Sequence, residues 1–82
     1  MPTISTFYGI TIFMNFNEHN PPHIHARYSG NIATFCIING EILRGCLPKN
    51  ATRMVKEFIE LHKSELLDMW ETKQFVTIPG LD

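Results

Sequence analysis

The stretch HIHARYSGNIATFCIINGEILRGCL, residues 23–47, decides the fold. β-branched and aromatic residues recur along it in short runs, as in the strands of an antiparallel sheet. Ser29-Gly30 and Asn39-Gly40 interrupt these runs, and both dipeptides favour tight two-residue hairpin turns. The stretch therefore predicts three antiparallel strands, at about residues 23–28, 31–38 and 41–47.

Another strand is expected before this stretch, at about residues 7–16. The sequence there, FYGITIFMNF, is rich in β-branched and aromatic residues and alternates as a strand does. The next segment, residues 17–22, contains Asn-Pro and Pro-Pro steps, which predict a loop. The sheet should therefore be a meander of four strands.

The period of the apolar residues changes after Pro48. Apolar side chains then recur every three or four positions as far as Trp70, the spacing of one helix face. This stripe predicts one long helix at about residues 49–72, with a break near Ser64 as the alternative. The tail at residues 75–78 is β-prone and predicts either a fifth strand or a disordered end.

The predicted fold is α+β, a four-stranded antiparallel meander sheet followed by one long C-terminal helix packed on one face. A lone meander would leave apolar surface in water, so the helix must cover one side of it. The 82 residues are expected to form a single domain, 1–82, with a thin margin of stability. We therefore expect a homodimer or a stable complex with a second chain.

Two-residue turns at both hairpins set the register of the sheet. His23 should then lie opposite Cys36, and His25 opposite Thr34. One face is expected to be polar, with Ile32, Ile38 and Leu43 as apolar exceptions. Its polar members are His23, His25, Arg27, Thr34, Cys36 and Glu41. The other face is apolar and should seat the helix. Its members are Ile24, Ala26, Tyr28, Ala33, Phe35, Ile37 and Ile42.

Three histidines fall within the segment HNPPHIH, at His19, His23 and His25. Imidazole titrates near neutral pH and is a frequent ligand of divalent metals such as zinc. His23 and His25 could therefore hold such a metal, with His19, Cys36 or a carboxylate as the third ligand. Alternatively, His23 and His25 could act as base and acid, with Arg27 as a phosphate clamp. The three histidines and Arg27 could also form a binding surface, or the rings could pin the Asn-Pro-Pro loop by hydrogen bonds.

Other chemically versatile side chains are expected to lie outside this cluster. His62 belongs to the apolar stripe of the helix and should be a buried, hydrogen-bonded core residue. Strand alternation places Cys36 and Cys46 on opposite faces, so both are expected to be free thiols.

The composition limits the location of the protein and its partners. The formal net charge is −1, which argues against broad electrostatic binding of nucleic acid. No segment approaches the roughly 20 apolar residues of a membrane span, and the N-terminus does not read as a signal peptide. Two cysteines are too few for a disulfide scaffold. We therefore expect a cytoplasmic protein with reduced thiols and no membrane partner.

The chain resembles a family of small bacterial proteins, domain-of-unknown-function family 4160. The resemblance covers nearly the whole chain. It is carried by ISTFYGI at 4–10, HNPPHIHARY at 19–28, the Asn39-Gly40 turn, Gly45 to Pro48, and the helix at 55–59, 61–62 and 65–66. The family pattern usually has an acidic residue where this chain has Cys36, and commonly also at Cys46. The resemblance therefore does not support Cys36 as a metal ligand, and the family-typical acidic third ligand is missing.

The resemblance implies little chemistry, since the family has no established activity. Its members are often encoded beside another small protein, in arrangements that look like toxin–antitoxin pairs. We therefore expect an interaction module that is one half of such a pair, with its protein partner encoded nearby. The alternative is a histidine- or metal-dependent hydrolase that acts on RNA.

Overall fold

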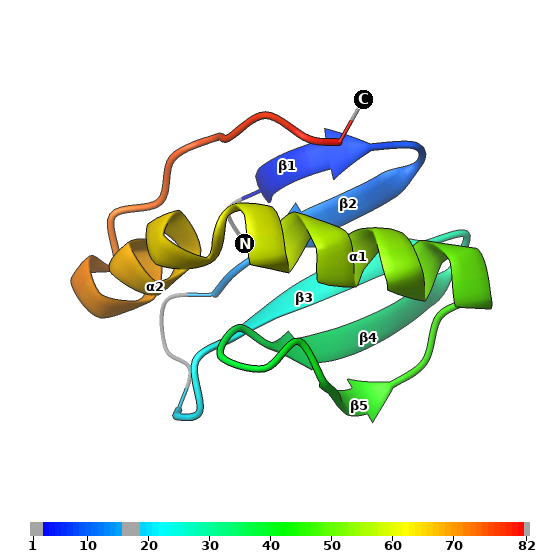
Figure 1. Ribbon diagram of the computed structural model, residues 1–82, viewed down its shortest axis with the longest axis horizontal. Helices are drawn as coiled ribbons and strands as arrows, with labels where there is room; N and C mark the ends of the chain where they lie inside the picture. The colour runs from blue at the N-terminus through cyan, green and yellow to red at the C-terminus, as the bar shows by residue number, and fades with distance from the viewer. Residues whose placement is uncertain (1–2, 16–18, 82) are drawn as a thin grey trace.

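The computed structural model describes residues 3–15 and 19–81. Five strands form one antiparallel sheet in chain order, and the helices pack on one of its faces (Figure 1). The α+β class and the antiparallel meander are confirmed, whereas the predicted numbers of strands and helices were wrong. The elements are β1 (Thr3–Phe7), β2 (Ile10–Phe13), β3 (His23–Tyr28), β4 (Asn31–Cys36), β5 (Ile42–Gly45), α1 (Lys49–Leu61) and α2 (Lys63–Thr72).

The single strand predicted at residues 7–16 is in fact part of a hairpin. Phe7 at the end of β1 pairs with Ile10 at the start of β2. Tyr8 and Gly9 form the turn between them, with φ of 49° and 78°. Two positive φ values in succession are those of a type I′ turn, whose twist matches a hairpin. Tyrosine seldom adopts this conformation, so only Gly9 marked the turn. Phe16, the last residue of the predicted strand, lies outside the described residues.

The hairpin between β3 and β4 has the predicted register. His23 pairs with Cys36 and His25 with Thr34. Ser29 and Gly30 form the two-residue turn, again with positive φ values of 48° and 83°.

The two-residue turn predicted between β4 and β5, at Asn39-Gly40, was wrong. The loop is longer than two residues, because the Cys36 amide donates to the Glu41 carbonyl and the Gly40 amide donates to the Cys36 carbonyl, both at 2.8 Å. A bulge then shifts the register between Thr34 and Phe35. Arg44 therefore lies opposite Thr34, on the same face as His25. A two-residue turn would have placed it on the helix-covered face.

The helix predicted at residues 49–72 is interrupted at His62, where φ is −117° and ψ is 23°. The alternative, a break near Ser64, was closer to the structure. His62 Nδ1 hydrogen-bonds Glu65 Oε1 at 2.7 Å, inside the first turn of α2. The change of direction lets α2 reach beyond the end of the sheet (Figure 1). No helix in the described part of the chain combines the length and apolar composition needed to cross a membrane.

The core lies between α1 and the apolar face of the sheet, as predicted. Phe35 and Ile37 of the predicted apolar face are fully buried, as are Val55 and Phe58 of the helical stripe. The Phe58 ring also stacks on Phe7 of β1, with centroids 5.0 Å apart.

The tail after α2 is neither a fifth strand nor a disordered end. It runs back to the β1 edge of the sheet (Figure 1). There the Ile78 amide donates to the Ile4 carbonyl at 2.9 Å, and the Ile78 side chain is buried. The tail thus covers part of one sheet edge, and β5 forms the other edge.

Candidate functional site

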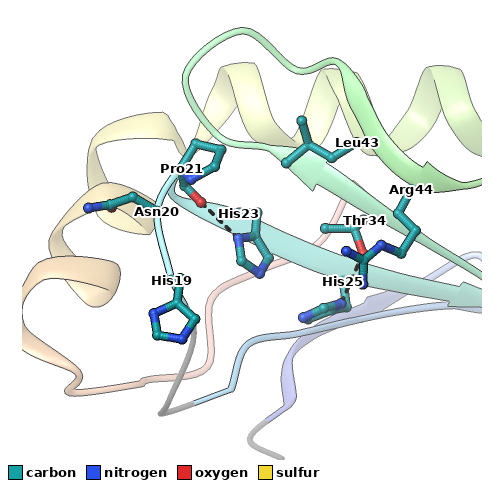
Figure 2. A pocket seen from close by; sticks show the side chains of 8 residues that line it. All are labelled: His19, Asn20, Pro21, His23, His25, Thr34, Leu43 and Arg44. Atoms are coloured by element: carbon teal, nitrogen blue, oxygen red, sulfur yellow. Dashed lines mark hydrogen bonds between the residues drawn. The ribbon is translucent and has the colours of Figure 1, made fainter.

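An open groove lies on the sheet face that α1 leaves uncovered. Its volume is about 520 Å³. Three of the four predicted site residues line it, and Figure 2 shows them together with their neighbours. The described residues that line the groove are His19, Asn20, Pro21, His23, His25, Thr34, Leu43 and Arg44.

One row of side chains crosses four strands at this groove. Phe13 of β2 pairs with His25 of β3, His25 pairs with Thr34 of β4, and Thr34 pairs with Arg44 of β5. Directly opposed side chains in an antiparallel sheet have Cβ atoms about 4.5–5.5 Å apart. The sheet itself therefore sets the spacing between His25, Thr34 and Arg44.

His25 is held in this row by contacts on several sides. Its ring stacks on Phe13, with centroids 5.0 Å apart and an interplanar angle of 16°. Its Nδ1 lies 3.3 Å from the Thr34 hydroxyl, and its Nε2 lies 3.5 Å from the Asn15 amide nitrogen. Both ring nitrogens of His25 therefore lie beside a polar side chain.

His23 is buried, and its orientation follows from its contact with the loop. Its Nδ1 lies 2.8 Å from the Pro21 carbonyl oxygen. A carbonyl only accepts, so Nδ1 carries the proton and donates it. The ring meets His25 edge-on, with centroids 5.2 Å apart. The structure thus confirms that a histidine hydrogen bond pins the Asn-Pro-Pro loop, and it also places two imidazoles side by side.

Trp70 of α2 closes one end of this arrangement. Its ring lies 4.9 Å from that of His23, and its Nε1–H donates to Asn20 Oδ1 at 3.3 Å. Lys73 in turn lies over the indole, with Nζ 4.0 Å from the ring centroid. Nothing in the helical spacing of Trp70 indicated a contact with the histidines.

Arg27 does not line the groove, although it shares the sheet face with His25. It pairs with Thr11 and Ile32, and its guanidinium carbon lies 5.6 Å from the centroid of the Phe13 ring. The cation that lines the groove with the histidines is therefore Arg44, which sequence reasoning missed. The bulge that turns Arg44 to this face lies between Ile42 and Arg44, and the neighbouring Gly45, with φ of 75°, was the nearest signal in the sequence.

The structure also shows where Glu41, His62 and the two cysteines lie. Glu41 was expected on the histidine face but its carboxylate lies 3.6 Å from Lys56 of α1, on the helix side. His62 is largely buried, as predicted, and packs on the Phe58 ring. Cys36 and Cys46 are free, also as predicted.

The described residues of the groove do not form a metal site. No three His, Cys, Asp or Glu side chains lie close enough to hold a metal ion within residues 3–15 and 19–81. The predicted zinc ligands His19, His23 and His25 are therefore not assembled as a ligand set. What the groove does contain is imidazole, guanidinium, hydroxyl and amide groups, which suit recognition of an oxyanion.

Comparison with known proteins gives a family but no activity. Neither the curated proteins nor the solved structures contain a match to this chain. The family model for a domain of unknown function, DUF4160, matches residues 9–71. That span covers well over half of the sequence, including β2 to β5, the groove and most of both helices. The chain therefore belongs to the DUF4160 family.

Proposed function

We propose that this chain is a protein-interaction module that binds its partner through the uncovered sheet face, as one half of a toxin–antitoxin-like pair. The observation that carries the proposal is the groove on that face, with exposed apolar side chains beside it. Leu43 lines the groove and is 48% exposed, and Ile32 on the neighbouring strand is 49% exposed. Exposed apolar residues beside polar groups are typical of a protein-binding surface.

The size of the domain supports the same proposal. A chain of this length has a small margin of stability, and association stabilises it further. The pairing of genes in the family, to which the sequence resemblance pointed, suggests a small protein encoded beside this one as the partner.

A second candidate is a histidine-dependent hydrolase acting on RNA. The observation that favours it is the presence of Arg44 beside two imidazoles. His23 and His25 would act as base and acid, and Arg44 would clamp a phosphate. We favour the interaction module because a net charge of −1 supplies no steering toward RNA.

The test is a binding measurement with the product of the neighbouring gene. The double variant His23→Asn/His25→Asn keeps side-chain donors near Pro21 and Thr34 and removes both imidazoles. We expect it to remain folded and to bind the partner at least about tenfold more weakly, the loss that corresponds to about 1.4 kcal/mol. Arg53→Gln, an exposed change on α1, is the matched control and should bind as the unmodified chain does.

The competing function is tested on the same proteins with RNA as substrate. Cleavage of RNA that disappears in His25→Asn, while the variant remains folded, would transfer support to the hydrolase. Absence of a complex between the unmodified chain and the neighbouring gene product would contradict the interaction module.

A further inference from the structure

We propose that the groove is an oxyanion subsite that receives a carboxylate side chain from an acidic, partly apolar segment of a protein partner. This inference rests on the proposed function and names the chemistry by which the partner is recognised. It is carried by the charge of the groove, by the arrangement of its donors and by the apolar residue at its side.

The charge of the groove has one sign in the part of the chain that the structure describes. Its ionisable lining side chains there are three histidines and Arg44, and no described lining residue is Asp or Glu. Three of the carboxylates elsewhere pair with side chains of the helical layer. Glu41 pairs with Lys56, Glu57 with Arg53, and Glu65 with His62. The structure gives Arg44 no ion pair with a described residue, so its charge is available to a ligand.

The donors beside Arg44 are arranged by the sheet. Arg44 is opposite Thr34, and Thr34 is hydrogen-bonded to His25. The Thr34 hydroxyl can donate as well as accept, so it adds a polar group beside the guanidinium. A guanidinium fork beside a hydroxyl donor suits a carboxylate, which accepts through two oxygens. Figure 2 shows Arg44 and Thr34 beside His25, with His23 between His25 and the loop that carries His19.

The apolar residues at the groove favour a carboxylate of a protein over a phosphate of a nucleic acid as the ligand. Leu43 shares the groove with Arg44, and Ile32 is exposed close by on β4. These two side chains would cover an apolar neighbour of the bound acidic residue, whereas a phosphate backbone has no apolar group to place there. A volume of about 520 Å³ also exceeds the space that one carboxylate fills, so a segment of chain fits.

The sole tryptophan of the chain provides a direct readout. Trp70 contacts His23 at the end of the groove, so its fluorescence reports on occupancy. The probes are a tetrapeptide Leu-Glu-Leu-Glu with blocked ends, the same peptide with Gln for Glu, and an oligouridine RNA of similar length. The side-chain Nε–Hε resonance of Arg44 in NMR spectra localises any binding.

We expect the Glu peptide to shift both signals with a Kd of about 1 mM or tighter at low salt, and to bind more weakly as salt is added. Arg44→Gln should weaken binding at least about tenfold. Arg44→Lys should restore part of it, because the charge returns without the fork. Arg53→Gln removes an equal charge from α1 and should leave binding unchanged.

The subsite is wrong if the Glu peptide produces no shift, if the Gln peptide binds equally well, or if Arg53→Gln weakens binding as much as Arg44→Gln does. RNA that binds where the Glu peptide does not would also overturn it, in favour of a phosphate site. Circular dichroism of each variant verifies that it is folded.

Failure of this inference is distinguishable from failure of the proposed function. If Arg44→Gln binds the neighbouring gene product as tightly as the unmodified chain, the subsite is wrong and the interaction module stands. If the unmodified chain forms no complex with that product, the proposed function fails whatever the peptide does.

Discussion

The imidazole of His23 packs against the indole of Trp70, with ring centroids 4.9 Å apart. One ring belongs to β3 and points away from α1, whereas the other comes from the last turns of α2. The contact exists because α2 extends beyond the end of the sheet after the break at His62 (Figure 1). Together with the hydrogen bond from Trp70 to Asn20, this contact attaches the loop that carries His19 and Asn20 to α2.

Trp70 should stabilise this loop through its hydrogen bond to Asn20 as well as through packing. Trp70→Phe keeps an aromatic ring but removes the donor, and Asn20→Ala removes the acceptor. We expect the lost hydrogen bond to lower the free energy of unfolding of each variant by about 0.5–1.5 kcal/mol. Urea denaturation of the two single variants and the double variant measures the coupling between the residues. Strictly additive costs would show that the hydrogen bond contributes nothing.

Phe58 should be among the most costly core residues to truncate. It is fully buried and stacks on Phe7, so Phe58→Ala is expected to lower the free energy of unfolding by about 3–5 kcal/mol. Such a loss threatens a domain of this size. Leu61→Ala on the same helix is the control, because Leu61 is 65% exposed and its truncation should cost less than about 0.5 kcal/mol. A loss below about 1 kcal/mol for Phe58→Ala would place this ring outside the core.

Gly45 should be irreplaceable next to the bulge that orients Arg44. A Cβ there would overlap the carbonyl oxygen of Ile32 and lie 3.1 Å from Ala33 Cα, and φ is +75°. At Gly30, φ is +83° but a Cβ would meet nothing within 4 Å. Gly30→Ala therefore measures the backbone strain alone, about 1–2 kcal/mol.

Gly45→Ala should cost more than Gly30→Ala in thermal or urea melts, because β5 must move away from β4. It should also speed hydrogen exchange of the β5 amides. Equal costs for the two variants would mean that the close approach to Ile32 does not constrain the bulge.

The exposed apolar residues beside the groove should drive assembly. We expect light scattering of the unmodified chain, alone or with the neighbouring gene product, to show a homodimer or a stable complex. Ile32→Ser combined with Leu43→Ser should weaken that assembly, whereas Leu61→Ser on the helix side should not. A monomer at every concentration, together with no complex with the gene product, contradicts this prediction.

Local sequence patterns were sufficient for much of the fold. The Ser29-Gly30 turn and the alternation on either side of it set the register that brings His23 opposite Cys36 and His25 opposite Thr34. The helical stripe correctly predicted the burial of Val55 and Phe58. These features follow from nearest-neighbour geometry, since strand alternation, turn conformation and helical periodicity all act over a few residues.

The first hairpin was missed for a local reason. Tyr8 adopts a positive φ that tyrosine rarely takes, and Gly9 alone is compatible with a strand, a bulge or a turn. Pairing of β1 with β2 selects the turn, and that pairing depends on the burial of Ile4 and Phe7 in the finished core.

By itself the sequence determined the antiparallel meander, the helix-covered face and the placement of His23 and His25 on the opposite face. Only the tertiary structure decided that Arg44, rather than Arg27, lines the groove and that Trp70 contacts His23 and Asn20. Both outcomes arise from small local changes with distant effects. A single bulged residue reverses the face of every side chain after it, and a break at His62 redirects a whole helix. Such changes are selected by the packing of the complete chain, so the short-range pattern of residues does not contain them.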